Sequence, residues 1–297
     1  MDYSARHHPA RSLFILWMVL TSGLTNGQDK QTIRWLTWQQ VPNFILDGPF
    51  QGQGIGDALT ATLQERLPQY NHVNIVSNTR RYNRLIREPD VCVAWAWIVP
   101  GSRDFRVHSR PISLAPRTGI QTLKSKQSMF GAPGETLSLA KLLANPKIKL
   151  GYLEEMTYSK DVHALLAQYK GQENVHFSSV DAVEFNLAML DRGRVDYFFG
   201  FSAQAIFDAE IKDIPNVYQF YNIDEISRYT SMHAHCFQNE FGNTVIAEAN
   251  KIIDEQLLLD HLARVERWYG KNEDYRKVFL NYVIQQNPSE RVSHPGQ

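Results

Sequence analysis

The sequence predicts an α/β protein with two lobes, each a mostly parallel sheet flanked by helices. Short apolar runs alternate with segments of helical period, which is the pattern of a largely parallel sheet covered by helices. This alternation pauses near residue 116 and then restarts. The chain has 297 residues, which exceeds the length at which a single core usually keeps growing. We therefore expect two lobes, with one compact domain as the alternative.

Residues 1–27 have the composition of a secretory signal peptide. Arg6 and Arg11 precede the apolar run 13–20, and small or polar residues follow it. The run is far shorter than the ~20 residues needed to span a bilayer. We expect cleavage to leave a mature periplasmic chain that starts at Gln28. An uncleaved membrane anchor is the alternative.

The first α/β unit comes directly after this segment. Residues 33–38 are rich in β-branched and aromatic side chains and precede a turn-prone stretch, which predicts a strand and a loop. Apolar residues recur on one helical face over 55–67, which predicts a helix. Further elements are expected as a strand at 73–76, a short helix near 82–86 and a buried strand within 91–99.

A second α/β unit is expected over roughly 116–230, followed by a different tail. Apolar runs predict strands at 119–123, 148–153, 175–177 and 195–199, and helical spacing predicts helices at 137–143, 162–169 and 183–190. In the tail, 229–237 alternates like a strand and 244–270 has helical period.

The domain boundaries follow from this order. No Gly/Ser-rich linker separates the two units, so we expect extended crossing strands near 115–118 and 228–232. Residues 28–116 and 231–297 then form a discontinuous first lobe, and 117–230 form the second.

Cys92 and Cys236 are the only cysteines in the sequence. Export would place them in an oxidising compartment, where a pair tends to form a bridge. Such a disulfide would tie the early part of the chain to the late part. Two buried free thiols are the alternative, since cysteine also behaves as a small core residue.

Composition and motifs argue against several function classes. The chain has 31 basic and 31 acidic residues and lacks the basic excess of a nucleic-acid-binding protein. It has no Gly-x-Ser-x-Gly, His-Glu-x-x-His or phosphate-loop motif, so we expect no enzymatic activity and no cofactor. His233 and His235 share one face of a predicted strand, but they lack a third ligand nearby, so no metal site is expected.

Four segments of the chain have a characteristic order and spacing. They are Trp35-Leu36-Thr37-Trp38 with Pro49-Phe50 and Gly54-Ile55-Gly56-Asp57-Ala58-Leu59; Pro100-Gly101-Ser102-Arg103 with Phe105, Ser109, Arg110 and Pro111; Lys149-Leu150-Gly151-Tyr152-Leu153 with Thr157-Tyr158; and Asp191-Arg192-Gly193-Arg194-Val195-Asp196. Together these segments resemble the bacterial extracellular solute-binding proteins of family three, the polar amino acid receptors with the type II periplasmic-binding fold. The similarity covers nearly all of the mature chain.

The resemblance implies a monomeric periplasmic receptor for amino acid transport. It would capture a small polar or anionic organic ligand between its lobes for an inner-membrane ABC permease. A sensory or regulatory ligand-binding module is one alternative. A dehydratase-like enzyme on the same fold, using the neighbouring Glu154 and Glu155, is a weaker one.

The resemblance also implies which residues bind the ligand. Arg103 matches the family's arginine, whose planar fork of donors suits a ligand carboxylate; a surface arginine paired with Asp104 is the alternative. Trp38 matches the aromatic cleft wall. Trp97 lies on the strand leading to Arg103, where a core role is the alternative. In the second lobe, Thr157 and Tyr158 would close on the ligand.

The sequence departs from the family at Phe201. The family places an acidic residue near this position to receive the ligand's α-ammonium, but this stretch reads Tyr197-Phe198-Phe199-Gly200-Phe201. A buried ammonium without an acceptor would cost several kcal/mol. We therefore expect Phe201 to line a site for an anionic or flat organic ligand and not for an ordinary α-amino acid.

Overall fold

The computed structural model describes Met1 and residues 29–98, 105–153, 158–178 and 183–286. The chain divides into two units, Met1–Lys30 and Gln31–Gln297, and the second unit is described by itself below. The signal predicted for residues 1–27 lies, apart from Met1, outside the described residues. Within these ranges, no helix combines the length and the apolar character needed to cross a membrane.

The first sheet contains six strands within the described residues. Its order is β2 (Asn71–Ser77), β1 (Thr32–Trp38), β3 (Val91–Trp97), β12 (Tyr229–Phe237) and β4 (Arg106–His108), and β5 (Ser113–Pro116) pairs with β12 off this path. Residues of β3 are buried along nearly its whole length, as its continuous apolar sequence requires for a strand covered on both faces.

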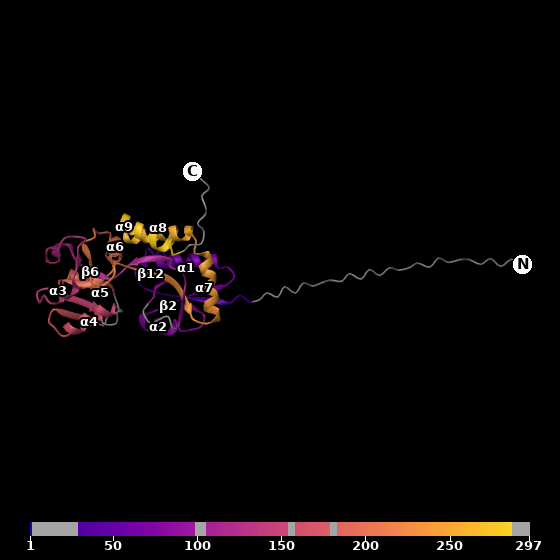
Figure 1. Cartoon of the computed structure of the whole chain (residues 1–297), viewed down its shortest axis with the longest axis horizontal. Coiled ribbons are helices and arrows are strands. Elements are labelled where there is room, and N and C mark those ends of the chain that lie inside the picture. The colour runs from indigo at the N-terminus through magenta and orange to yellow at the C-terminus, as the bar shows by residue number, and fades with distance from the viewer. Residues whose placement is uncertain (2–28, 99–104, 154–157, 179–182, 287–297) are drawn as a thin grey trace, which may run out of the picture. The chain divides into compact units, whose positions relative to one another are not determined.

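Helices cover both faces of the first sheet (Figure 1). The larger core lies between the sheet and α1 (Ile55–Arg66), α7 (Glu240–Ile252) and α8 (Glu255–Tyr269), and a smaller core lies under α2 (Thr79–Leu85). The chain continues as α9 (Glu273–Phe279) and a π-helical turn, Leu280–Ile284. The tail expected to be helical over 244–270 is two helices, because Asp254 accepts the Leu257 N–H and caps a new one.

The second sheet also has six strands among the described residues. Its order is β7 (Thr136–Leu137), β11 (Tyr218–Ile223), β6 (Gly119–Leu123), β10 (Tyr197–Gly200), β8 (Leu150–Leu153) and β9 (Val175–Ser178). One core joins it to α3 (Leu139–Leu143) and α4 (Lys160–Tyr169), and another to α5 (Val183–Asp191) and α6 (Ser202–Ile211). A 3₁₀ helix, η2 (Lys124–Met129), follows β6.

We call β1–β5, β12, α1, α2 and α7–α9 the first lobe, and β6–β11 with α3–α6 the second lobe. This confirms the predicted two-lobed α/β class. Both sheets are mixed: parallel pairings are the majority in the second sheet, as expected, and the minority in the first. Strand β12 runs antiparallel to β3, β4 and β5, and β6 runs antiparallel to β10 and β11. The reason is the connectivity: the chain leaves the first sheet at β5, and returns to it at β12, by extended strands instead of helical crossovers.

The two crossings lie side by side. Tyr229 of β12 is paired with Pro116 of β5, and the Arg117 N–H donates to the Arg228 carbonyl at 3.0 Å. These strands carry the chain between the sheets at the residues expected for crossing strands. The exact domain boundaries stay a prediction.

A disulfide joins Cys92 on β3 to Cys236 on β12. The two cysteines are directly opposite in the antiparallel pair, although 144 positions separate them in the sequence. The bridge therefore closes the middle of the first sheet between its early and late strands. All elements of the second lobe lie inside the loop of the chain that the bridge closes.

Candidate functional site

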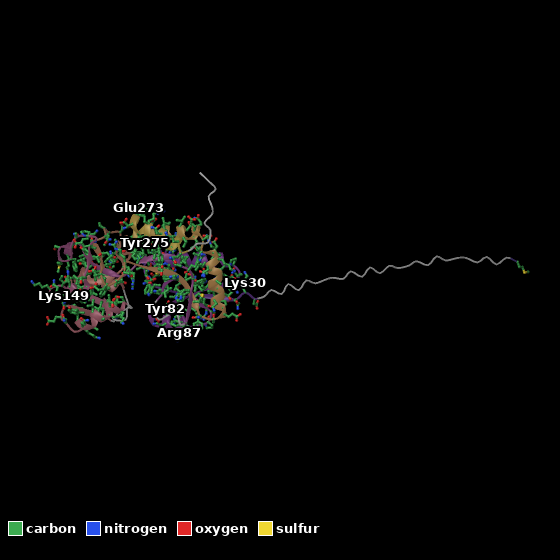
Figure 2. The ribbon with its side chains drawn as sticks, viewed as in Figure 1. Lys30, Tyr82, Arg87, Lys149, Glu273 and Tyr275 are labelled. Atoms are coloured by element: carbon green, nitrogen blue, oxygen red, sulfur yellow. A yellow bond between two sulfur atoms is a disulfide. The ribbon has the colours of Figure 1, made fainter. Side chains whose placement is uncertain are left out.

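The side chain of Trp38 is held in place at the end of β1. Its indole ring packs on Phe44 at 4.8 Å and edge-on against Tyr82 at 5.0 Å between ring centroids. Its Nε1–H donates to Gln40 Oε1 at 3.1 Å. Tyr82 lies on α2 and is labelled in Figure 2. The aromatic residue expected at the cleft wall is therefore half-buried with a fixed ring.

The loop after β1 is tied to the start of α1. The Asp57 carboxylate accepts the N–H groups of Ile45 at 2.8 Å and Gly54 at 3.1 Å, so one side chain joins the middle of the loop to its end. A Cβ at Gly56 would lie 2.4 Å from the Phe44 ring, so the close packing of Phe44 requires glycine there. The Gly-x-Gly-Asp sequence thus positions Phe44, which supports Trp38.

The two tryptophans of β3 have different surroundings. Trp95 is 3% exposed and belongs to the first-lobe core. Trp97 is half-buried, lies at the end of the strand opposite Met232, and packs on the margin of the same core. Trp97 therefore keeps part of its ring accessible next to the segment that leads to Arg103. Arg103 itself lies outside the described residues.

In the second lobe, Tyr158 precedes α4 and is 8% exposed. Its ring packs on Phe199 of β10 at 4.8 Å, and its backbone N–H donates to His163 Nε2 at 3.1 Å. Because Nε2 accepts this bond, the hydrogen-bond network assigns the proton of the neutral ring to Nδ1. Thr157, the other residue expected to close on the ligand, lies outside the described ranges.

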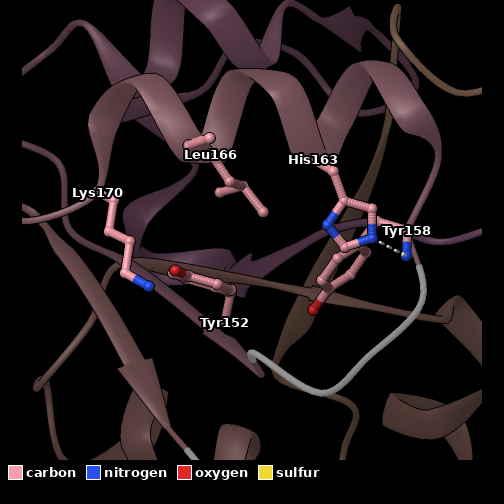
Figure 3. Close-up of a pocket in the computed structure, with 6 residues that line it drawn as sticks. Tyr152, Tyr158, His163, Leu166 and Lys170 are labelled. Atoms are coloured by element: carbon pink, nitrogen blue, oxygen red, sulfur yellow. Dashed lines mark hydrogen bonds between the residues drawn. The ribbon is translucent and has the colours of Figure 1, made fainter.

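A cavity of about 180 Å³ lies beside Tyr158, between α4 and β8 (Figure 3). Figure 3 shows His163 and Tyr158 on one side of it and Tyr152 and Lys170 on the other. Its lining residues are Tyr152, Tyr158, His163, Leu166, Ala167 and Lys170. Ligand pockets usually measure roughly 300–1,000 Å³, so this cavity alone accommodates only a fragment of a ligand.

Phe201 lies at the junction of β10 and α6 and is 8% exposed. Its N–H donates to Gln204 Oε1 at 3.1 Å, and its carbonyl accepts from Gln121 Nε2 at 2.8 Å. The backbone of this junction is therefore satisfied by two glutamines, and the side chain adds only apolar surface. Residue 201 itself therefore offers no carboxylate that could accept a hydrogen bond from a ligand ammonium.

Sequence reasoning missed a contact between the two lobes. Phe207 of α6 belongs to the first-lobe core, with its ring 5.4 Å from Trp268 of α8 and 6.1 Å from Phe50. Beside it, Arg267 Nη1 donates to Glu210 Oε2 at 2.9 Å, and Nη2 bonds the other carboxylate oxygen. No signal in the sequence pairs these residues, because α6 was not expected as a helix.

Among the residues that the structure describes, no three His, Cys, Asp or Glu side chains are arranged to hold a metal ion. Two groups do combine aromatic and polar side chains: Trp38 with Tyr82 and Gln40 in the first lobe, and Tyr158 with His163 in the second. Such surfaces suit flat or amphipathic organic groups, because an aromatic body is paired with nearby hydrogen-bonding atoms.

No protein-family model matches the chain, and no curated protein matches it in sequence. Solved structures do match. The periplasmic VFT2 domain of Bordetella pertussis BvgS is 14% identical, with a TM-score of 0.54, over 80% of this chain and 92% of that domain. The substrate-binding protein of an amino acid ABC transporter is 12% identical, with a TM-score of 0.56, over 81% of this chain and 100% of its own.

An ancestral arginine-binding protein bound to arginine is 16% identical, with a TM-score of 0.60, over 81% of this chain and 99% of its own. All three likenesses extend over most of both chains. They agree with the two mixed sheets, their helical layers and the paired crossing strands described above. The chain therefore has the two-lobed type II periplasmic-binding fold.

Proposed function

We propose that this protein is a periplasmic solute-binding protein that captures a small polar or anionic organic ligand between its lobes for an ABC permease. The observation that carries the proposal is the pair of adjacent crossing strands between two sheets, with Tyr229 opposite Pro116. Two lobes joined in this way can close by a hinge motion. The protein would act as an exported monomer, with lobes formed by 28–116 plus 231–297 and by 117–230.

The ligand would be held by residues from both lobes. Arg103 would pair with a ligand carboxylate, with Trp38 and Trp97 as aromatic walls. Thr157 and Tyr158 would close from the second lobe, and Phe201 would supply apolar surface. The apolar Phe201 and its satisfied backbone favour an anionic or flat ligand over one with a free ammonium.

A thermal-shift screen of the protein from Gln28 onward tests the proposal. Amino acids, organic acids and small peptides would be compared on the wild type, on Arg103→Ala, and on Arg84→Ala, an exposed arginine of α2. A ligand that binds only the native state raises the melting temperature by mass action. We expect an organic anion to stabilise the wild type and Arg84→Ala but not Arg103→Ala.

Three results would contradict parts of this proposal. If no compound stabilises the wild type, ligand capture is wrong. If a hit still stabilises Arg103→Ala, capture stands but the binding role of Arg103 is wrong. A free amino acid whose binding depends on its ammonium would contradict the preference for an anionic or flat ligand.

A sensory module is the second candidate, and the likeness to a BvgS VFT domain favours it. Growth separates the two roles once a ligand is known. A transport receptor is required for growth of its host on low concentrations of that ligand as sole nutrient source. A sensor is dispensable for this growth, but its deletion changes the transcriptional response to the same ligand.

A further inference from the structure

His235 is a fully buried imidazole in the middle of β12. Its exposed fraction is 0%, and neither ring nitrogen has a hydrogen-bond partner. It lies opposite His108 of β4, with 5.5 Å between ring centroids. Neutral imidazole tolerates such a position far better than imidazolium, because an unpaired charge without water is costly.

The groups that face His235 carry positive or titratable nitrogen atoms. From β4 come His108 and Arg106, which is 7% exposed, and from β12 comes His233, whose Nδ1 lies 2.8 Å from the Ser109 carbonyl. Strand β3, on the other side of β12, has only apolar side chains over Val91–Trp97.

The region around Arg106 adds further positive charge. Its guanidinium lies 5.7 Å from the Tyr82 ring centroid of α2 and 4.8 Å from that of Phe105. A second arginine, Arg87, follows α2 and lies 4.0 Å from the centroid of the same Phe105 ring. Figure 2 labels Tyr82 and Arg87. Within the described residues, no carboxylate pairs with Arg106 or His235. The nearby Glu88 and Asp90 are bound by Arg34.

We propose that His235 is an acid-sensitive element that loosens β4 from β12 when the surrounding pH falls. A proton on its ring would place a charge beside Arg106 with no acceptor for either N–H. Opening of the strand pair exposes the ring to water, where it takes a proton freely. Burial and the neighbouring cations hold the pKa of His235 well below its usual range, in agreement with this geometry.

Strand β12 connects the site of this loosening to the hinge. The same strand continues from His235 back to Tyr229, which pairs with β5 at the crossing between the lobes. A register irregularity lies between His233 and His235, so the strand is already uneven at this point. Acid would therefore act on the strand that carries the chain from the second lobe back to the first.

Hydrogen exchange followed by mass spectrometry tests the proposal on the ligand-free protein. Labelling times are adjusted to cancel the intrinsic pH dependence of exchange, and peptides from β4, β12 and β8 are compared at pH 7.5 and 5.5. His235 is neutral while the strand pair is closed and has an ordinary pKa near 6.5 when the pair is open. The equilibrium constant for opening is therefore about tenfold larger at pH 5.5 than at pH 7.5. We expect this loss of protection in β4 and β12 and not in β8.

His235→Leu should remove the acid response in β4 and β12, because leucine cannot take a proton and both ring nitrogens lack partners. The matched control is His261→Leu on α8, another buried histidine, which should leave the response of β4 and β12 intact. Equal protection at both pH values in the wild type, or an unchanged response in His235→Leu, would overturn the proposal.

A direct measurement covers the case in which His235→Leu does not fold. Deuterium exchange at the C2–H of each histidine reports its titration in the wild-type protein. We expect no titration of His235 between pH 7.5 and 5.5 while the strands stay closed. A normal titration midpoint near 6.5 in the folded protein would contradict the proposal.

Discussion

The two lobes differ in the groups of their cores that respond to reductant and to acid. In the first lobe, the Cys92–Cys236 disulfide joins two strands, and His261 is buried in the core. In the second lobe, polar side chains bind backbone groups: Asn174 Nδ2 donates to two carbonyls at 3.1 Å, and Glu225 accepts N–H groups at the start of α3. The first lobe should therefore respond to reductant and acid, and the second to loss of single polar side chains.

The largest expected effect comes from removing the disulfide. Replacing Cys92 and Cys236 together by alanine should lower the free energy of unfolding by about 4 kcal/mol, because the bridge closes a long loop in the unfolded chain. Urea denaturation followed by tryptophan fluorescence measures this change. The wild type in reductant serves as a control and should match the double variant. A loss below about 1 kcal/mol would show that the first lobe does not depend on the bridge.

Asn174→Ala is expected to have the next largest effect. It removes the donor to the carbonyls of Leu143 and Asn145 at a buried site, which should cost about 2–3 kcal/mol. The exposed amide Gln168→Ala on α4 is the control and should change little. If the two variants are equally stable in urea, the prediction is wrong, because the second lobe then does not depend on the Asn174 amide.

A third prediction concerns acid and His261. Burial lowers the pKa of His261 to about 4, from an ordinary value of 6.5 in the unfolded chain. The unfolded state thus binds a proton first as pH falls, so stability is full above pH 6.5 and declines below it until about pH 4. At pH 5 this group alone should remove about 2 kcal/mol.

Urea midpoints at pH 7.5 and 5 measure this effect. His261→Leu should lose less stability on acidification than the wild type, and His176→Gln, an exposed histidine of the second lobe, should behave as the wild type does. If His261→Leu kept the full pH dependence, the acid sensitivity of the first lobe would have another source.

The smallest expected effect lies at the contact between the lobes. The Arg267 and Glu210 side chains are 48% and 33% exposed, so solvent screens their attraction. A double-mutant cycle with Arg267→Met and Glu210→Gln should give a coupling of about 0.5 kcal/mol. A coupling well above 1 kcal/mol would mean that this pair, and not the aromatic contact of Phe207 beside it, is the main connection between α6 and α8.

Much of the fold can be predicted because it follows from local patterns of apolar and polar residues in the sequence. Apolar periodicity correctly indicated β1, α1 and β3, and Cys92 and Cys236 suggested a bridge that the structure contains. The short strand Arg106–His108 has too few residues for any periodicity, so it was not expected. Its pairing with β12 is decided by contacts between distant parts of the chain.

The candidate site was only partly accessible to the same reasoning. Trp38 was expected at a cleft wall, and the structure places it in a fixed aromatic group with Tyr82 and Phe44. The binding roles of Arg103 and Thr157 stay predictions. The contact of Phe207 with the first-lobe core could not be predicted, because an apolar residue at that position is equally suited to the core of its own lobe.

The α/β class and the order of most elements follow from the amino-acid order alone, because they depend on spacing between near neighbours, and the same sequence supplies the two cysteines of the bridge. Which distant groups meet depends on the folded chain. His233 and His235 suggested at most two metal ligands in the sequence, but the fold adds His108 and Arg106 and excludes water. One of these imidazoles, that of His235, thus becomes a fully buried group with a lowered pKa, since burial and neighbouring charge act through space and not along the chain.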